Sequence, residues 1–275
     1  MIKLVWMAFS LFFCETLLAA APSIDNIDQG DLDKVVKEFS ANFAHAPVSP
    51  PSSLGKIFGF ELGAVAGATS TPEFQRLVKE VDPDTNIPYI PHAGIFAALS
   101  VPFGITLEAN LIPKTTVSDV SIDNVGLGLK WTMTNVFWTA SPFDLALRAH
   151  YSSSQLSFKQ TVQNASTSNQ PVDAVVTYDS NSYGVNLSAG ARLIFIEPYA
   201  GLGFIKGKGD LSVSGSSFVS IFNTTFSSSQ SASSDATSAH LFAGLQFDLL
   251  LFHLGFEYGN AFGVNRYSAK LSLAF

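Results

Sequence analysis

From Ile57 to its last residue, the chain is a series of short segments in which apolar residues alternate with polar or small ones. Successive side chains of a β-strand point to opposite faces, so this alternation predicts strands with one apolar and one polar face. We place ten such segments, each near the roughly 9 to 11 residues that a tilted strand needs to cross a bilayer. No later stretch is apolar over the roughly 20 residues that a transmembrane helix requires.

The connections between these segments alternate between short and long. The short ones are Val101–Gly104, Asn135–Pro142, Phe195–Pro198 and Leu249–Phe252. The long ones are Gly67–His92, Pro113–Asp123, Ser152–Ser182 and Lys206–Ser238, with a tight one near Asn260–Asn265. This alternation predicts an all-β, membrane-spanning, antiparallel up-and-down β-barrel of about ten strands, with short periplasmic turns and longer outer loops. The serine-rich Lys206–Ser238 is either a mobile loop or a hairpin that extends above the membrane. The count becomes twelve if Leu211–Phe226 joins the wall.

The last strand places Tyr267, Leu271, Leu273 and Phe275 on one face and its charged residues on the other. This closing aromatic strand resembles the assembly signal of bacterial outer-membrane β-barrel proteins. The resemblance implies the outer membrane of a Gram-negative-type bacterium, with its lipid and lipopolysaccharide as surroundings. It also implies assembly by the barrel-assembly machinery and periplasmic chaperones. It does not identify a specific family.

The N-terminus has the order of a secretory signal peptide. Lys3 precedes a mostly apolar run that ends in Ala19–Ala21, and Glu15 interrupts this run before it is long enough for a transmembrane helix. We therefore expect three parts: a signal peptide over 1–21, a helix and Pro-rich linker over 22–56, and the barrel over 57–275. The only cysteine, Cys14, falls within the signal peptide, so we expect a mature chain without disulfides.

Two amphipathic helices are predicted outside the strands. The first follows Asp31, which can cap it, and ends before Pro47; its apolar stripe is Leu32, Val35, Val36, Phe39 and Phe43. This helix either plugs the lumen, rests on the inner headgroups or does neither stably. The second, Pro72–Val81, lies in the first outer loop, and its apolar side chains can fold down as a lid.

The composition is rich in apolar and small residues. Mean hydropathy is +0.27 with 13% charged residues, 24 Phe and 20 Gly. A barrel that turns apolar side chains toward lipid explains such values, although a soluble β-sandwich can share them. The net charge of −7 argues against a nucleic-acid partner.

Six charged residues fall on the inward register near mid-height: Glu61, Glu108, Lys130, Arg148, Glu257 and Lys270. Strand order predicts two lumenal clusters. Glu108, Lys130 and Arg148 fall on the third, fourth and fifth strands, and Glu61, Glu257 and Lys270 fall on strands that become neighbours when the barrel closes. The clusters are either salt bridges that fill the barrel or a constriction that selects solutes by charge. Their balanced signs favour packing.

Ten glycines share the inward register: Gly59, Gly63, Gly126, Gly128, Gly184, Gly190, Gly201, Gly203, Gly244 and Gly255. An eight-stranded barrel is just filled by its own side chains. Ten strands with these glycines therefore leave a channel or room for an inserted segment, unless the glycines serve only to let the sheet coil.

No catalytic, cofactor or metal motif is present in the sequence. His150 and His240 lie near outer strand ends, where Asp144, Asp179 or Asp235 could serve them as carboxylate partners. We expect no enzyme and no cofactor; an outer-membrane hydrolase is the remote alternative. The sequence favours a passive channel or transporter for small polar or hydrophobic solutes. The alternative is a non-conducting structural or adhesive barrel whose outer loops bind a surface or partner.

Overall fold

The computed structural model describes residues 27–55, 57–117, 119–138, 141–163, 171–215 and 231–275. The expected signal peptide, 1–21, therefore lies outside the described residues. No helix in these ranges is long and apolar enough to cross a bilayer.

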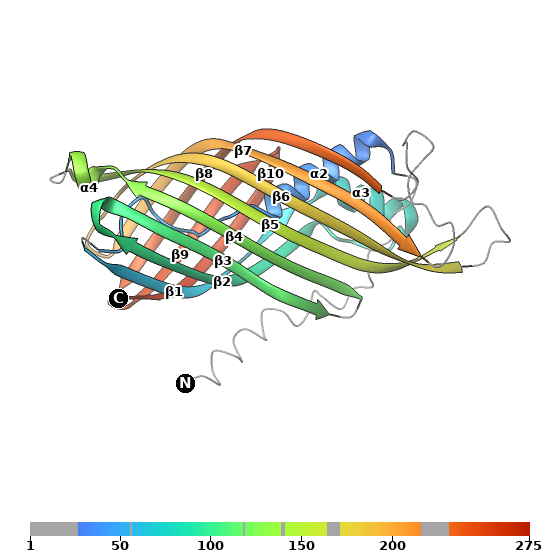
Figure 1. The fold of residues 1–275 in the computed structure, drawn as a ribbon, viewed down its shortest axis with the longest axis horizontal. Helices are drawn as coiled ribbons and strands as arrows, with labels where there is room; N and C mark the ends of the chain where they lie inside the picture. The colour runs from blue at the N-terminus through green and yellow to red at the C-terminus, as the bar shows by residue number, and fades with distance from the viewer. Residues whose placement is uncertain (1–26, 56, 118, 139–140, 164–170, 216–230) are drawn as a thin grey trace.

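Ten antiparallel strands form a closed barrel in which every strand pairs with its two neighbours (Figure 1). They are β1 (Gly59–Ser70), β2 (Tyr89–Val101), β3 (Ile105–Val117), β4 (Val120–Thr132), β5 (Phe143–Gln163), β6 (Pro171–Ala191), β7 (Ile196–Gly215), β8 (Ser231–Leu249), β9 (Phe252–Ala261) and β10 (Val264–Ala274). β1 closes onto β10 with Leu62 opposite Leu273. The predicted ten-stranded barrel is confirmed. Of the Leu211–Phe226 stretch, residues 211–215 belong to β7, and 216–226 lie outside the described residues.

The outer surface of the barrel carries an apolar belt. Its exposed side chains include Leu99, Leu107, Leu127, Leu129, Val185, Leu187, Leu202 and Leu241. The closing-strand residues Tyr267, Leu271, Leu273 and Phe275 are exposed on the same outer surface. Aromatic side chains at the short turns, such as Phe103, Trp138 and Phe252, are also exposed. These features match a barrel that faces lipid, with an aromatic girdle at one interface.

We call the end of the barrel with the short turns the turn end, and the opposite end the loop end. At the turn end lie η1 (Pro102–Gly104), the short helix α4 (Thr134–Phe137) and the C-terminus. Under the rule that barrel turns are short on the periplasmic side, the turn end faces the periplasm.

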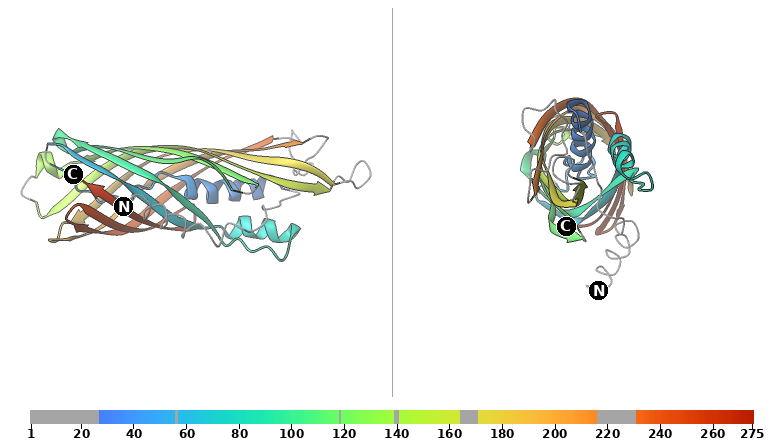
Figure 2. Two further views of the ribbon diagram at one scale, coloured as in Figure 1. Left: turned by 90° about the horizontal axis from the view of Figure 1, so that it is seen from below. Right: turned by 90° about the vertical axis from the view of Figure 1, so that its right-hand side faces the viewer.

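The wall is much taller on one side than on the other (Figure 2). β5 to β8 have 21, 21, 20 and 19 residues, whereas β9, β10 and β1 have 10, 11 and 12. The expectation of long loops at Pro113–Asp123 and Ser152–Ser182 is therefore wrong over much of these ranges. In Lys206–Ser238, β7 and β8 continue upward as in the hairpin alternative, while 164–170 and 216–230 lie outside the described residues. Most of the described residues in these ranges belong to strands that extend beyond the membrane. In these extensions, serine and threonine still alternate with buried apolar residues, which keeps the strand pattern.

The N-terminal segment runs through the barrel. Helix α2 (Gln29–Phe43) lies inside the ring of strands (Figure 2), and residues 44–55 continue toward the turn end, where β1 begins. Its N-cap is Asp28, whose carboxylate accepts a hydrogen bond from the Asp31 backbone N–H at 2.8 Å. The expectation that Asp31 caps this helix is wrong, because the helix starts two residues earlier.

Candidate functional site: the occupied lumen

Residues 27–55 fill the lumen, and we call them the plug. Ile27 is buried at the loop end among side chains of β5, β6 and β7, whereas Ser53 accepts a hydrogen bond from Asn135 at the turn end. The plug therefore spans the barrel, and its contacts define what the lumen can do.

The first predicted charge cluster comes together at mid-height. Arg148 Nε lies 2.8 Å from Glu108 Oε2, and Lys130 Nζ lies 3.7 Å from Glu108 Oε1. All three side chains are buried. His45 of the plug adds a fourth member, with its Nε2 3.5 Å from Glu108 Oε2. No sequence pattern predicted a role for His45, because it lies outside any repeating pattern.

The two cations of this cluster also hold the plug. Lys130 Nζ donates hydrogen bonds to Ser49 Oγ at 2.9 Å and to the carbonyl oxygens of Pro50 at 2.7 Å and Ser52 at 2.9 Å. Arg148 Nη2 donates to the Ser49 carbonyl at 3.0 Å. Since proline supplies no N–H, the Pro-rich linker presents mainly carbonyl oxygens as hydrogen-bond acceptors. The donors come from the wall side chains Lys130 and Arg148.

In the second predicted cluster, only two of the three residues meet. Lys270 Nζ lies 2.7 Å from Glu61 Oε1, and Ser272 Oγ also donates to that oxygen. Glu257 instead accepts a hydrogen bond from Tyr199 Oη at 2.9 Å. Strand adjacency was right, but Tyr199 of β7 reaches Glu257 of β9 by passing over Gly244 of the intervening strand β8.

Wall side chains also satisfy the C-terminal end of α2. Arg266 Nη1 donates to the carbonyls of Ala44 at 2.7 Å and Ala41 at 3.1 Å. Asn124 Nδ2 and Ser152 Oγ donate to the Phe43 carbonyl at 3.0 and 2.8 Å. The last carbonyls of a helix have no partner within it and carry partial negative charge, so these donors suit them. Sequence reasoning missed Arg266 as a plug contact.

Several inward glycines lie directly beneath the plug. A Cβ built at Gly128 would lie 2.6 Å from His45 Nε2, one at Gly255 would lie 2.9 Å from Val48 Cγ1, and one at Gly190 would lie 2.9 Å from Pro51 Cγ. A side chain at these positions would collide with the plug. Of the two explanations for the glycines, room for an inserted segment therefore holds at these sites.

The loop end of the lumen is apolar. The predicted plug-helix residues Leu32, Val35, Val36, Phe39 and Phe43 are all buried there. They pack with Leu156, Phe158, Val176, Tyr178, Leu211 and Val213 of the wall and with Phe74, Leu77 and Val78 of α3 (Pro72–Val81). The Phe39 ring centroid lies 4.9 Å from that of Tyr178 and 5.0 Å from that of Phe74. Phe39 thus joins wall, plug and α3.

Glu38 links α2 to α3. Its buried carboxylate accepts hydrogen bonds from the backbone N–H groups of Glu73 at 2.7 Å and Phe74 at 2.9 Å, at the N-terminus of α3. Burial raises the pKa of Glu38 to about 6, although the two N–H donors oppose this shift. Lys34 Nζ lies 3.2 Å from Glu73 Oε2, and Arg76 pairs with Asp31.

The histidines considered for catalysis do not meet their proposed carboxylate partners. Asp144 accepts from Thr134 Oγ1 at 2.9 Å, Asp179 accepts from Gln155 Nε2 at 2.7 Å, and Asp235 lies 2.9 Å from Lys206 Nζ. His150 instead stacks near His45, with ring centroids 6.0 Å apart, and His240 Nδ1 lies 3.3 Å from Asn186 Oδ1. Within the described ranges, no group of three or more histidine, cysteine or carboxylate side chains could hold a metal ion.

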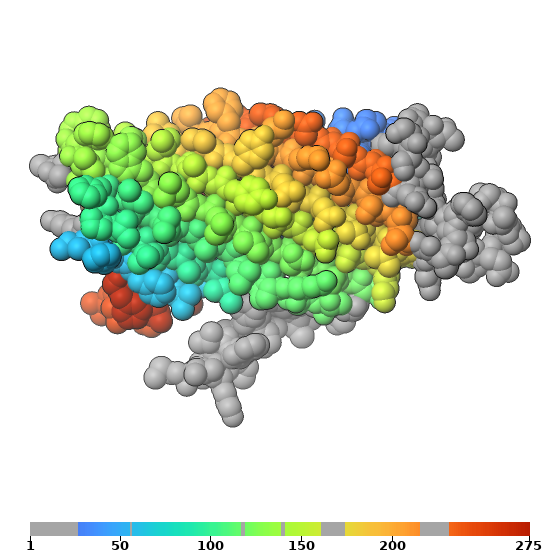
Figure 3. All heavy atoms as spheres, in the orientation of Figure 1, coloured from blue at the N-terminus to red at the C-terminus, as the bar shows by residue number. Residues whose placement is uncertain are grey.

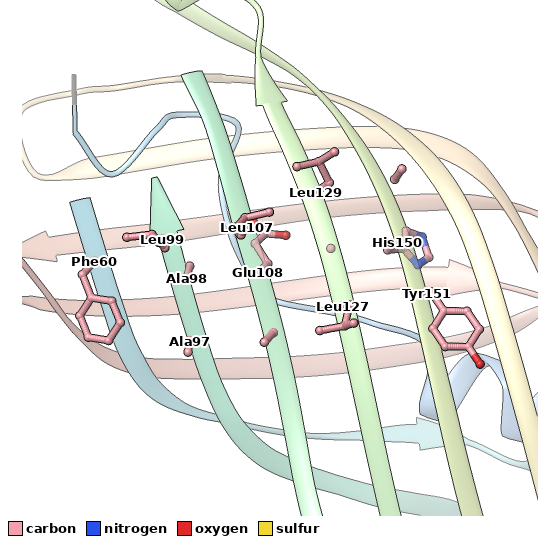
Figure 4. A pocket seen from close by; sticks show the side chains of 13 residues that line it. Phe60, Ala97, Ala98, Leu99, Leu107, Glu108, Leu127, Leu129, His150 and Tyr151 are labelled. Carbon is pink, nitrogen blue, oxygen red and sulfur yellow. The ribbon is translucent and has the colours of Figure 1, made fainter. Parts of the chain in front are cut away.

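Two hollows border the site. A polar cavity of about 130 Å³ lies at the turn end between the plug and wall residues that include Glu61, Lys130 and His253. The other is an apolar hollow on the outer surface of β1 to β5, where Ala97 and Ala109 lie among larger side chains such as Phe60, Leu127 and Tyr151 (Figure 4). The second hollow lies on the lipid-facing side of the wall.

Comparison with known proteins gives a family and several structural likenesses. A family model described as a family of unknown function (DUF6588) matches residues 25–275. No curated protein matches the chain in sequence.

The similar solved structures are bacterial outer-membrane proteins. The NalP autotransporter translocator domain from Neisseria meningitidis is 12% identical, with 90% of this chain and 94% of that chain covered and a TM-score of 0.42. Ail, the attachment invasion locus protein of Yersinia pestis, is 14% identical, with 79% and 97% covered and a TM-score of 0.33. The Escherichia coli outer-membrane protease OmpT is 9% identical, with 79% and 96% covered and a TM-score of 0.37. The closed barrel and its apolar belt are those of an outer-membrane protein.

Proposed function

This chain belongs to the family of unknown function DUF6588, and we propose that it is an outer-membrane channel for small solutes, closed in its resting state by its own plug. We propose no catalytic role. Its surroundings are outer-membrane lipid and lipopolysaccharide, and its insertion depends on the barrel-assembly machinery acting on the closing strand that ends at Phe275.

The observation that carries the proposal is the way in which the plug is held. Lys130, Arg148 and Arg266 bind it mainly through its backbone carbonyls. It joins the described barrel covalently only through the short connection to β1, and glycines of the wall lie under it. The plug can therefore leave without breaking a strand pair, and a glycine-lined lumen would remain.

Release of the polar contacts around residues 44–55 has a moderate cost. A hydrogen bond to a charged group contributes about 1.5–3 kcal/mol, and water entering an opened lumen replaces much of this. Glu108, Lys130 and Arg148 would then line a constriction of mixed charge. With Glu61, Glu257 and Lys270 of the second cluster, the lumen holds three acids and three bases, so weak ion selectivity is expected.

The test is conductance in a planar bilayer with a plug that can be locked. Val48 of the plug faces Gly255 of β9, and the 2.9 Å between Val48 Cγ1 and a Cβ at Gly255 places the two Cβ atoms within disulfide reach. The variant Val48→Cys/Gly255→Cys is expected to be silent when oxidised and to show openings when reduced. A variant lacking residues 31–46 is expected to conduct steadily.

Val48→Cys alone is the matched control. It cannot form the disulfide, so its conductance should not change when the reductant is added. Silence from the deletion variant, in a protein shown to be folded by its heat-dependent gel mobility, would contradict the channel. It would favour the second candidate, a non-conducting barrel that binds a surface or partner. The observation behind that candidate is the height of β5 to β8, which carry polar outward residues such as Ser157 and Lys159 far beyond the membrane.

A further inference from the structure

Above the membrane the barrel reverses its polarity. On β5, the inward residues change from Arg148, His150 and Ser152 to Leu156 and Phe158, while the outward residues change from Leu147 and Ala149 to Ser157 and Lys159. On β6 and β7 the inward residues at this level are Val176, Tyr178, Leu211 and Val213, all buried. The loop end thus encloses an apolar chamber within a polar shell.

The chamber lacks a wall on one side, where the strands are short. β9, β10 and β1 end far below the tips of β5 to β8, and α3 lies at the rim on this lower side (Figure 2). The space-filling view shows the tall wall of β5 to β7 as a continuous surface (Figure 3). Phe74, Leu77 and Val78 of α3 turn toward the chamber and are buried. α3 therefore covers the opening on the low side.

α3 is fastened to the plug helix rather than to the barrel. Within the described residues, its polar contacts beyond its own loop go to Asp31, Lys34 and Glu38 of α2. The loop that carries α3 closes at its base, where the Thr71 N–H donates to the Pro88 carbonyl at 3.0 Å and Thr71 Oγ1 donates to the Ile87 carbonyl at 3.2 Å. The loop can swing about this base without disturbing strand pairing.

We propose that α3 is a lid and that, when it lifts, the apolar chain of an amphiphilic solute binds in its place, against Phe39, Tyr178 and Leu211. This inference rests on the proposed function and names the class of solute that the channel takes. An apolar chain would bury the surfaces that Phe74, Leu77 and Val78 cover in the closed state, so the chamber loses little apolar burial when α3 leaves.

The lid position also suggests the direction of entry. The rim under α3 is the lowest part of the loop end, so it is the part of the chamber nearest to the outer leaflet. A solute that is already partitioned into lipid would reach the chamber from this side. The lower part of the plug, which begins at the C-terminal end of α2 held by Arg266, separates the chamber from the polar lumen.

Photo-crosslinking in lipid nanodiscs tests the chamber, with palmitic acid carrying a diazirine at its chain end as the probe. Annular contacts label the lipid-facing residues Val185 and Leu187, whereas entry labels peptides containing Leu156, Val176 or Leu211. Glu38→Ala removes both hydrogen bonds to the α3 N-terminus and is expected to raise chamber labelling about tenfold. Glu80→Ala is the matched control, because Glu80 is an exposed acid whose partner Arg76 lies on α3 itself.

Equal chamber labelling in the two variants, or labelling of lipid-facing peptides alone, would overturn the lid and the solute class. Heat-dependent gel mobility checks that both variants are folded. The channel is tested separately. If the plug-deletion variant conducts but the chamber is not labelled, the channel proposal stands and the amphiphilic solute is rejected. If the chamber is labelled but no variant conducts in planar bilayers, the binding site stands and the channel proposal is rejected.

Discussion

The lower and upper halves of this barrel are built from the same strands but have opposite polarity. At bilayer level the outside is apolar and the inside holds Glu108, Lys130, Arg148 and the Glu61–Lys270 pair. Above the bilayer the outside is polar and the inside is a cluster of apolar side chains around Phe39. The plug passes through both halves, so it is held by charge-assisted hydrogen bonds below and by apolar packing above.

This difference matters because the two kinds of contact respond to different changes. Polar contacts in a lumen can be replaced by water when the plug moves, whereas buried apolar surface needs an apolar substitute. The lower half is thus suited to release of the plug, and the upper half is suited to exchange of one apolar occupant for another.

The largest effect is expected from breaking the charge cluster of the lower half. Glu108→Gln leaves Arg148 and Lys130 buried beside a neutral group, and loss of one partner from a buried ion pair costs about 3–5 kcal/mol. The free energy of unfolding in detergent, measured by denaturant titration, should fall by that amount. Lys206→Ala, which breaks the exposed pair with Asp235, serves as the control and should leave stability unchanged.

A loss as small for Glu108→Gln as for Lys206→Ala would mean that water already reaches Glu108 in the resting state. The two halves would then differ less than their burial indicates, and the lower lumen would count as partly open.

The next largest effect is expected in the upper half. Phe39→Ala removes the ring that joins Tyr178 to Phe74, and such cavities cost about 3–5 kcal/mol, with the low end expected because α3 can settle into the space. Hydrogen exchange should quicken in α2 and α3 but not in β9 or β10. Phe204→Ala, whose side chain is exposed on the lipid-facing surface, is the size-matched control. Equal acceleration throughout the barrel would show that the halves are one cooperative unit.

Much of this architecture could be predicted from the alternation of apolar and polar residues. The places where that prediction was wrong have a physical cause. Leu127 and Leu129 predicted β4 correctly because the outer face of this part of the strand is in contact with lipid throughout, so its outward residues are all apolar. In Ser152–Ser182 the alternation continues through Leu156, Phe158, Val176 and Tyr178, but the apolar residues change to the inner face, so the strands read as serine-rich loops.

The candidate site was harder to predict than the fold. Glu108, Lys130 and Arg148 could be grouped because neighbouring strands fix their distances. The contacts of Arg266 with Ala44 and of Lys130 with Pro50 join the wall to the plug, and they depend on where the plug lies. The contact of Tyr199 with Glu257 depends on the direction of a long side chain that passes over Gly244 of β8. Strand order alone specifies neither.

The smallest effect concerns the joint between plug and lid, where the halves are coupled by Glu38. Its pKa is about 6 in the folded protein against 4.5 for the unperturbed group, so the folded state binds the proton more tightly. The contribution to the α2–α3 contact is therefore fully present below pH 4.5 and is lost as the pH rises through 6. Its size is at most about 2 kcal/mol, before screening by solvent reduces it.

Lys34 and Glu73 face the same carboxylate, with Lys34 opposing the shift and Glu73 adding to it. Hydrogen exchange of the α3 amides, corrected for its intrinsic pH dependence, should show less protection at pH 7 than at pH 4.5. Glu38→Gln cannot titrate and should remove that difference. If the variant keeps it, another group couples the lid to pH, and Glu38 holds α3 by hydrogen bonding alone.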